Sequence, residues 1–213
     1  MNKFLKIVKE NYKWIICFMC LILFLLIAED VFNKDVMRGD ILGYNLVRKY
    51  LISKDITSIM KFITWFGSAS CLILTSVLLL GLIKNKKMGL LSILNLFIIT
   101  VFNQLFKFIL QRPRPSNYNI ITEKGYSFPS GHSMVSMAFY GYIIYLVYKY
   151  IKNKYLKWTI ISILSLLIIS IGISRIYLGV HYTSDVLAGF LISISYLVIY
   201  INLTSAMLNE NAS

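Results

Sequence analysis

Charged residues are scarce in this chain of 213 residues, and their scarcity excludes an ordinary soluble domain. Only 15% of the residues are Asp, Glu, Lys or Arg, 58% are hydrophobic, and the mean hydropathy is +0.71. Soluble domains carry about 25% charged residues on average. The apolar residues form runs that approach or exceed the roughly 20 residues that a helix needs to cross a bilayer. The composition therefore predicts an integral membrane protein, with the lipid bilayer as its surroundings.

The sequence also lacks internal repeats, low-complexity linkers and any break in composition. We therefore predict a single domain over residues 1–213. The expected fold class is all-α, a six-span transmembrane helical bundle. The predicted spans are about Trp14–Ala28, Phe62–Ile83, Met88–Phe108, Ser133–Tyr148, Trp158–Ile173 and Val186–Met207.

Cysteine is rare, and its placement argues against a redox or zinc centre. The three cysteines, Cys17, Cys20 and Cys71, all fall inside predicted spans. Cys17 and Cys20 have C-x-x-C spacing, but redox or zinc chemistry needs polar access that this apolar run does not provide. We expect all three to behave as small hydrophobic residues.

Acidic residues are few, so that Lys and Arg outnumber Asp and Glu 22 to 9 and the net charge is +13. The lysines gather before the first span and in the second and fourth loops: Lys3, Lys6, Lys9, Lys13, Lys84, Lys86, Lys87, Lys149, Lys152, Lys154 and Lys157. This is the positive-inside pattern, which explains the charge without a nucleic-acid partner. We therefore expect a multi-pass protein of the plasma membrane, with cytoplasmic N- and C-termini and no bound nucleic acid.

The segment 41–52, between the first two predicted spans, has two possible structures. Leu42, Leu46 and Tyr50 recur at a spacing of four, and Arg48 and Lys49 lie off that stripe. The spacing is typical of an amphipathic helix lying on the outer membrane surface. An ordered loop is the alternative, and the sequence does not decide between them.

Three groups of polar residues near the membrane are not explained by the positive-inside pattern. They are Lys107, Arg112 and Arg114; Ser130 and His132; and Ser174, Arg175, His181 and Asp185. Alternating spans would bring all three groups to the extracytoplasmic side. A charge that faces lipid is costly, up to roughly 3 kcal/mol near the bilayer centre. One such cation could reach the headgroups by itself, but four cations, both histidines of the chain and a carboxylate on one side favour a polar site.

The cations and the PSGH segment suit a phosphate. Lys107 offers a point charge, whereas Arg114 and Arg175 offer planar forks that match two phosphate oxygens, so that together they would do the work of a metal. Gly131 lets the backbone approach a ligand closely, and the first N–H groups of the following helix form an anion site. Ser130 adds a hydroxyl to the same place.

The histidines suit phosphoryl transfer. His181 and Asp185 are four residues apart at the start of the sixth span, so on a helix they would share a face. The carboxylate would then hold the proton on one ring nitrogen while the other nitrogen attacks phosphorus. His132 would protonate the leaving oxygen. These residues make a complete phosphoryl-transfer site without a cofactor.

Three motifs carry a resemblance to a known family. The sequence has K-x6-R-P at Lys107–Pro115, P-S-G-H at Pro129–His132 and S-R-x5-H-x3-D at Ser174–Asp185. This pattern resembles the three-part signature of the type 2 phosphatidic acid phosphatase superfamily, in its bacterial membrane branch. The resemblance extends from Lys107 to about Gly189, with Thr183 standing where many members have proline.

The resemblance implies a role for each motif residue and implies neither a metal nor a cofactor. His181 would form a phosphohistidine, Asp185 would orient it, and His132 would protonate the leaving group and then activate water. The phosphate would be bound by Lys107, Arg114, Ser130, Gly131 and Arg175. Arg112 lies outside the signature, so we assign it only to headgroup attraction or to structure.

The expected function is hydrolysis of a lipid phosphate or diphosphate at the extracytoplasmic membrane surface, by a metal-independent phosphatase. Candidate substrates are isoprenoid diphosphate (undecaprenyl diphosphate), phosphatidic acid and phosphatidylglycerophosphate. The charge of Arg112, Arg114 and Lys124 slightly favours the diphosphate. A lipid phosphotransferase would use the same residues, and a transporter or anion-lipid binder without catalysis is the alternative from another class. The oligomeric state cannot be predicted from this sequence.

Overall fold

The computed structural model describes residues 3–33, 37–116 and 119–209, and all of their regular secondary structure is α-helical. The helices are α1 (Lys3–Phe32), α2 (Arg38–Leu51), α3 (Lys54–Trp65), α4 (Ala69–Leu82), α5 (Lys86–Leu110), α6 (Gly131–Tyr150), α7 (Lys154–Tyr177) and α8 (Thr183–Asn209). The predicted all-α fold is therefore confirmed over the residues that the structure describes.

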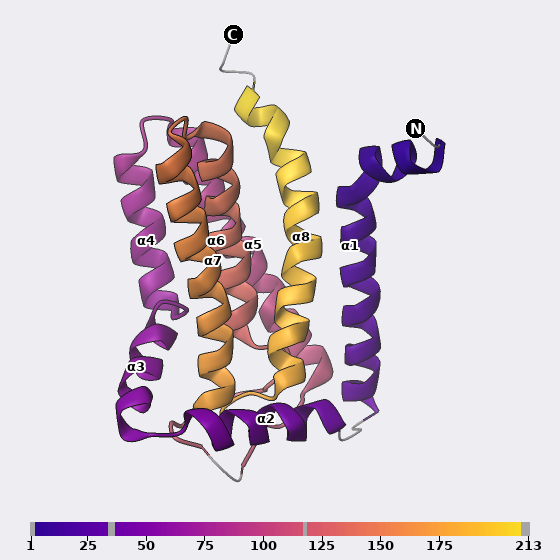
Figure 1. Ribbon diagram of the computed structural model, residues 1–213, viewed down its shortest axis with the longest axis vertical. Helices are drawn as coiled ribbons and strands as arrows, with labels where there is room; N and C mark the ends of the chain where they lie inside the picture. The colour runs from indigo at the N-terminus through magenta and orange to yellow at the C-terminus, as the bar shows by residue number, and fades with distance from the viewer. Residues whose placement is uncertain (1–2, 34–36, 117–118, 210–213) are drawn as a thin grey trace.

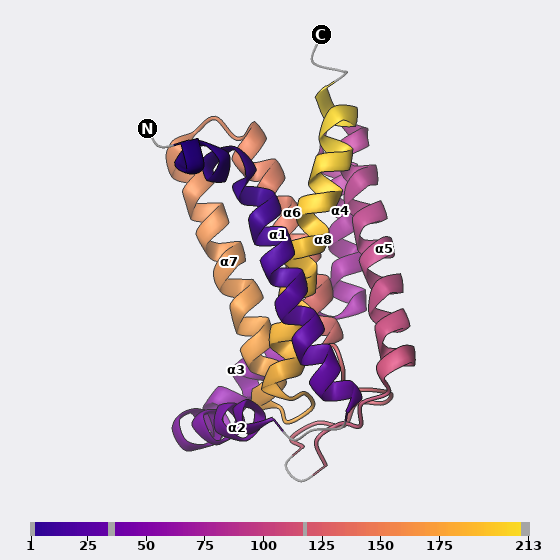
Figure 2. The same ribbon diagram turned by 90° about the vertical axis from the view of Figure 1, so that its right-hand side faces the viewer.

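The long helices stand side by side in a bundle, with α2 lying across one end (Figures 1 and 2). Helix α6 packs against α5, α7 and α8, and α1 packs along α8 on one flank. The core around α6 includes Ile99, Met134, Ala138, Phe139 and Ile171, each 0% exposed. The start of α1 and the end of α8 lie at the end opposite α2, together with the α4–α5 and α6–α7 connections (Figure 1).

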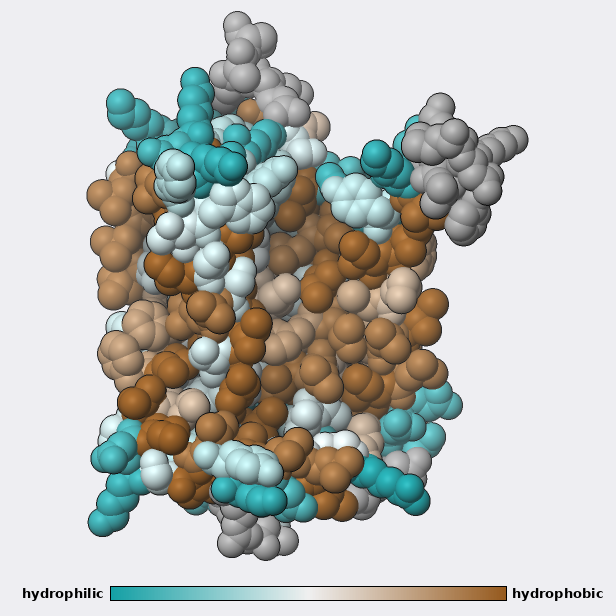
Figure 3. Space-filling view, viewed as in Figure 1, coloured by the Kyte–Doolittle hydropathy of each residue, from teal (hydrophilic) through white to brown (hydrophobic). Residues whose placement is uncertain are grey.

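On the face that Figure 3 shows, hydrophobic side chains form a broad band across the middle of the bundle, and hydrophilic ones gather at its two ends. Four helices in the described ranges are long and apolar enough to span a membrane: Val8–Phe32, Lys86–Leu110, Lys154–Tyr177 and Thr183–Leu208. They correspond to the first, third, fifth and sixth predicted spans. The chain is therefore a membrane protein, because a soluble fold buries such surfaces.

The second predicted span, Phe62–Ile83, is wrong as one straight helix. The chain bends by 49° between Lys54–Trp65 and Ala69–Leu82, and the pair counts as a fifth span if it is taken together. The break arises because Ser68 caps α4: its Oγ accepts a hydrogen bond from Cys71 N and donates one to Trp65 O. A capping side chain of this kind starts a new helix even inside an apolar run.

The fourth predicted span, Ser133–Tyr148, lies within α6 and stays a prediction, because α6 is not among the four helices long and apolar enough to span a membrane. Its serines, tyrosines and histidine replace aliphatic residues, since α6 faces other helices rather than lipid. Polar groups inside a bundle find partners there: Tyr140 Oη donates to Phe66 O at 2.8 Å, and Ser193 Oγ of α8 donates to Met134 O at 2.7 Å. Contacts with neighbouring helices therefore account for the polar residues of α6.

The segment 41–52 lies almost wholly in a helix, because α2 runs from Arg38 to Leu51. The ordered-loop alternative is therefore wrong. Leu42, Leu46 and Tyr50 are 63%, 57% and 66% exposed and form an apolar stripe on its outer side. The same helix turns Asp40 inward, where the side chain is buried.

Candidate active site

All the predicted site residues lie at the end of the bundle that α2 crosses. Lys107 is in the last turn of α5 and Arg175 in the last turn of α7, while Gly131 and His132 begin α6. Ser130 is the residue that caps α6, Asp185 lies in the first turn of α8, and Arg114 and His181 occupy the connections before α6 and α8. Four helix ends and two loops therefore converge on one site.

His181 is paired with Asp185, although not on one face of a helix as the spacing suggested. Helix α8 begins only at Thr183, so His181 precedes it. The His181 Nδ1 atom lies 3.4 Å from Asp185 Oδ2, and Tyr182 N donates to the same oxygen at 2.8 Å. Asp185 thus accepts from the backbone ahead of its own helix, which turns the preceding histidine towards it.

The carboxylate has a further partner that the motifs did not indicate. Ser127 Oγ donates a hydrogen bond to Asp185 Oδ2 and lies 3.4 Å from His181 Nδ1. Ser127 is fully buried in the α5–α6 connection. Nothing in the spacing of this serine distinguishes it from a surface loop residue, so only the folded chain identifies it.

The contacts of His181 determine its tautomer. Arg114 Nη1 lies 3.1 Å from His181 Nε2, and a guanidinium has only donors. Nε2 must therefore be the accepting nitrogen, and the proton resides on Nδ1, which faces Asp185. Burial lowers the pKa of His181 to about 4, with Asp185 opposing that effect and Arg175 and Arg114 adding to it. At neutral pH the ring is uncharged and its Nε2 lone pair points towards the cations.

Arg114 and Arg175 are both anchored by the chain around them. Arg114 donates from Nε to Gly125 O at 3.0 Å and from Nη1 to Val180 O at 2.9 Å. Arg175 is 1% exposed and donates to Thr64 Oγ1 and to Glu123 Oε1, each at 2.7 Å. Its Nε is buried without a hydrogen-bond partner in the described residues. A buried guanidinium with an unused donor is suited to binding an anion.

Glu123 and Thr64 are site residues that the motifs did not predict. Burial alone would raise the pKa of the Glu123 carboxyl, but the hydrogen bond and charge of Arg175 outweigh it and the pKa is lowered. Glu123 is therefore ionised beside Arg175. A carboxylate in an otherwise cationic outer loop is a sequence signal that could have found it, whereas Thr64 carries no such signal.

Lys107 and Gly131 face each other across the start of α6. A Cβ built on Gly131 would lie 3.9 Å from Lys107 Nζ and 3.0 Å from Asn103 Oδ1. A larger side chain at Gly131 would therefore crowd the space beside the lysine. Asn103, one turn before Lys107, donates to Pro129 O at 3.2 Å and so ties α5 to the PSGH segment.

Ser130 and His132 lie on either side of Gly131 but differ in their surroundings. Ser130 is fully buried, and its Oγ accepts from Ser133 Oγ at 3.0 Å. Its hydroxyl is therefore engaged in capping α6. The His132 ring packs against Gly67, where a Cβ would lie 3.0 Å from His132 Cδ2. The ring is close enough to Arg175 and His181 to interact electrostatically with both.

Arg112 is an internal residue rather than a headgroup anchor. Its guanidinium donates to Asp185 Oδ1 at 2.6 Å and to Asp40 Oδ2 at 2.7 Å, and it lies 4.0 Å from the centre of the Tyr182 ring. Of the two roles that we left open for Arg112, the structural one is correct. Within the described ranges, no group of three or more His, Cys, Asp or Glu residues is placed to hold a metal ion.

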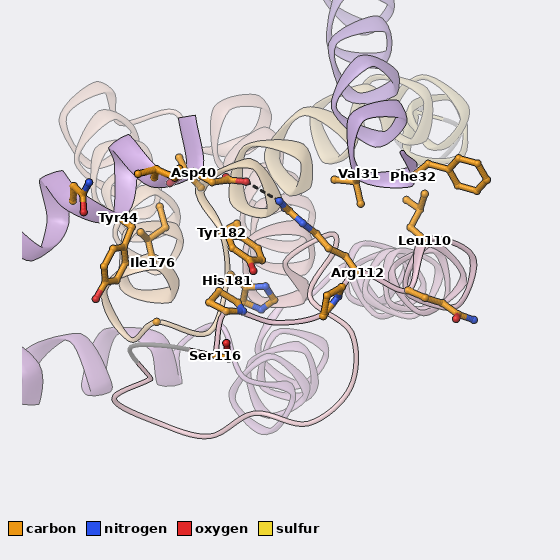
Figure 4. A pocket seen from close by; sticks show the side chains of 17 residues that line it. Val31, Phe32, Asp40, Tyr44, Leu110, Arg112, Ser116, Ile176, His181 and Tyr182 are labelled. Atoms are coloured by element: carbon orange, nitrogen blue, oxygen red, sulfur yellow. Dashed lines mark hydrogen bonds and ion pairs between the residues drawn. The ribbon is translucent and has the colours of Figure 1, made fainter. Parts of the chain in front are cut away.

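A cavity of about 740 Å³ adjoins the site (Figure 4). Val31, Phe32 and Leu110 form an apolar part of its wall, where α1 and α5 end. Among the predicted site residues, His181 lines this cavity, and the predicted phosphate-binding residues do not. Arg112 and Tyr182 also border it, as Figure 4 shows.

The comparison with protein families decides the identity of this arrangement. The model of the PAP2 superfamily matches residues 88–207, which include every predicted site residue. The chain belongs to the PAP2 superfamily. The resemblance inferred from the three motifs is thereby confirmed, and with it the assignment of the chain as a phosphatase.

Several characterised proteins are similar to this PAP2 chain. Phosphatidylglycerophosphatase B of Bacillus subtilis is 34% identical over 63% of this chain and 68% of its own length. An undecaprenyl-diphosphatase of Sulfolobus acidocaldarius is 27% identical over 92% of this chain and 94% of its own length. The crystal structure of a transmembrane PAP2-type phosphatidylglycerolphosphate phosphatase from Bacillus subtilis superposes with a TM-score of 0.79 at 25% identity. It covers 89% of this chain and 96% of the other.

Proposed function

We propose that this PAP2 protein is a membrane lipid phosphatase that hydrolyses a lipid phosphate or diphosphate through a phosphohistidine on His181. The observation that carries this proposal is the state of His181. Its ring is neutral, its Nδ1 proton is directed at Asp185, and its Nε2 accepts from Arg114. A buried imidazole in this tautomer is a ready nucleophile for phosphorus.

In the first step, Nε2 of His181 forms a bond to phosphorus as the bond from phosphorus to the lipid oxygen breaks. Lys107, Arg114 and Arg175 offset the negative charge of the transferring phosphoryl group, with Arg175 offering its unused Nε. Asp185 stabilises the imidazolium that develops on His181. His132, protonated beside the anionic phosphate, gives its proton to the departing lipid oxygen.

In the second step, water replaces the lipid. His132 now accepts a proton from water, whose oxygen attacks phosphorus while the bond to His181 breaks. Inorganic phosphate then leaves, His181 is neutral again, and His132 again carries the proton. In both steps the phosphoryl group is also bound at the start of α6, at Ser130 and Gly131. The first N–H groups of a helix favour negative charge.

The membrane topology that we propose has six spans, with the bent α3–α4 pair as the second and α6 as the fourth. The site end would then be extracytoplasmic, and both termini would be cytoplasmic. Support comes from the lysines of the α4–α5 and α6–α7 connections, which lie at the end opposite the site (Figure 1). Labelling of single cysteines introduced at Lys87 and Lys124 by an impermeant reagent in intact cells would test this, with only the second expected to react.

The substrate that we propose is a lipid phosphate, with undecaprenyl diphosphate and phosphatidylglycerophosphate as the leading candidates and phosphatidic acid as a third. The lipid tail would approach from the bilayer, past the apolar wall formed by Val31, Phe32 and Leu110. Arg112 is already paired with Asp40 and Asp185, so Arg114 and Lys124 remain as the cations that would favour a diphosphate.

Phosphate release from these three lipids and from glucose 6-phosphate, measured as kcat/KM in mixed micelles, tests the proposal. We expect a clear preference for the lipids, because the site lies at a helix-bundle end beside an apolar wall. A preference for glucose 6-phosphate would contradict the proposal. Labelled phosphate recovered on a second lipid rather than as inorganic phosphate would assign the protein as a phosphotransferase that uses the same site.

A further inference from the structure

The surface helix α2 contributes one buried carboxylate to the site end of the bundle. Asp40 lies in the first turn of α2 and is 6% exposed, whereas Ile41 and Leu42 beside it are 53% and 63% exposed. A charge is buried in this way only when it is well paired. The partners of Asp40 come from the start of α8 and from the loop after α5.

Both oxygens of Asp40 are engaged by residues that adjoin the catalytic pair. Oδ1 accepts from Ser184 N at 2.8 Å, and Oδ2 accepts from Ser184 Oγ at 2.9 Å. Oδ2 also accepts from Arg112 Nη2 at 2.7 Å. Asp40 therefore supplies an acceptor to the first turn of α8, the position where a helix has N–H groups without partners of its own.

Arg112 extends this contact to the catalytic carboxylate. Its Nη1 donates to Asp185 Oδ1 at 2.6 Å and to Ser184 Oγ at 2.7 Å, while Nη2 binds Asp40. One guanidinium thus bridges two carboxylates. Asp185 Oδ1 is held by Arg112, so Oδ2 is left to face His181, Tyr182 N and Ser127.

The backbone of α2 is docked just as closely at a second point. A Cβ built on Gly43, about one turn after Asp40, would collide with the side chain of Thr183. Only glycine lets α2 lie this near to the start of α8. Two independent contacts therefore seat α2 against the helix that carries Asp185.

We propose that Asp40 is a positioning residue for the nucleophile: through Arg112 and Ser184 it fixes the Asp185 carboxylate against His181. The position of the surface helix α2 then affects the reaction at His181, although α2 contacts His181 only through intermediate residues. This inference rests on the proposed function, because it assumes that Asp185 orients His181 for attack on phosphorus.

The test compares Asp40→Asn with Asp55→Asn, a matched change of an exposed aspartate in the first turn of the next helix, α3. In Asp40→Asn an amide replaces the charge that pairs with Arg112. We expect kcat and the single-turnover rate of phosphohistidine formation to fall about 10-fold, with KM changed less than about twofold. We expect Asp55→Asn to match the wild type in all three.

A double-mutant cycle identifies the route of the effect. Arg112→Lys keeps a charge but cannot bridge two carboxylates. If Asp40 acts through Arg112, the double variant Asp40→Asn/Arg112→Lys should be no slower than the worse single variant within about twofold. Fully multiplicative losses would overturn the bridge. If Asp40→Asn yields no folded protein, Arg112→Lys carries the test alone, and a wild-type kcat for it would overturn the inference.

A purely structural role for Asp40 predicts a different result. Asp40→Asn would then lower only the thermal midpoint and the yield, and the folded fraction would keep the wild-type kcat and phosphohistidine rate. That result would overturn this inference and leave the proposed function intact. Hydrolysis by the wild type without any phosphohistidine would instead overturn the proposed mechanism.

Discussion

The two ends of α7 carry cations in opposite circumstances. At its start, Lys154 is exposed. One turn on, Lys157 is partly exposed, and its Nζ lies 5.3 Å from the centre of the Tyr148 ring. In its last turn, Arg175 is 1% exposed and paired with Glu123 and Thr64. An exposed cation interacts weakly because water and salt screen it, whereas a buried one must be paired and interacts strongly.

The same contrast holds for the whole bundle. The lysines at the α4–α5 and α6–α7 end suit orientation of the chain in the membrane, which needs charge but no fixed geometry. At the other end, specific acceptors near a neutral histidine hold three arginines, Arg112, Arg114 and Arg175. The burial of a cation, rather than its presence at a span end, therefore distinguishes the proposed binding role from a topological one.

The largest loss of activity is expected from a change at His181. His181→Ala should abolish phosphohistidine and lower kcat by a factor on the order of 10⁴ or more, because the proposed nucleophile is lost. Acid-labile phosphoenzyme and phosphate release measure both quantities. Lys149→Ala, at the opposite end, is the control and should stay within about twofold of the wild type. Near-normal turnover by His181→Ala would remove it as the nucleophile.

His132→Ala should have the next largest effect, roughly 10² to 10⁴-fold on kcat, because the leaving oxygen must depart without a proton. The loss should shrink for a substrate with a good leaving group such as p-nitrophenyl phosphate. Comparison of kcat for that ester and for a lipid phosphate measures it. Equal losses on both substrates would contradict the role of His132 as the acid.

The two cations of α7 provide a direct test of the comparison. Arg175→Ala should lower kcat/KM by roughly 10² to 10³-fold, because a preorganised donor to the phosphoryl group is lost. Arg175→Lys should recover little, since an ammonium cannot bind Thr64, Glu123 and phosphate together. Lys157→Ala should change kcat/KM by less than about twofold. Similar losses at both ends of α7 would show that burial does not distinguish the roles of these two cations.

The pH dependence should be smaller and should report the burial of His181. The pKa of His181 is lowered from its ordinary 6.5 to about 4, so the nucleophile stays neutral well below neutral pH. We expect the acid limb of kcat/KM to fall near pH 4 rather than near 6.5. The unfolded chain binds this proton at higher pH, so the contribution of His181 to stability is complete above about pH 6.5 and is lost as the pH falls towards 4. An acid limb near 6.5 would show that the ring is solvated.

The smallest expected effect is that of chelation. If Lys107, Arg114 and Arg175 offset the phosphoryl charge, EDTA should leave the rate unchanged, and vanadate should inhibit by imitating five-coordinate phosphorus on His181. Phosphate release with and without each reagent measures this. A strict requirement for magnesium would contradict the proposed role of the cations.

Much of the site was predictable because the chemistry requires particular residue types in three short motifs. Lys107, His132 and His181 were identified by their residue type and by the alternation of spans, which brings span ends together. Ser127 and Thr64 escaped because their importance lies in which atoms they meet across the bundle, whereas Glu123 could have been noticed as a carboxylate in a cationic loop. Asp40 escaped for the same reason, since Ser184, its partner, is 144 residues away in sequence.

The membrane class, the family and the set of charged and titratable residues expected to bind phosphate could be inferred from the sequence alone, because composition and motif spacing are local properties of the chain. Only the tertiary structure decided that α3 and α4 are separate helices, that His181 precedes α8, and that Arg112 pairs with Asp40 and Asp185. The physical reason is that a buried charge is tolerated only where specific partners surround it. Those partners come from distant segments, which meet only when the helices pack.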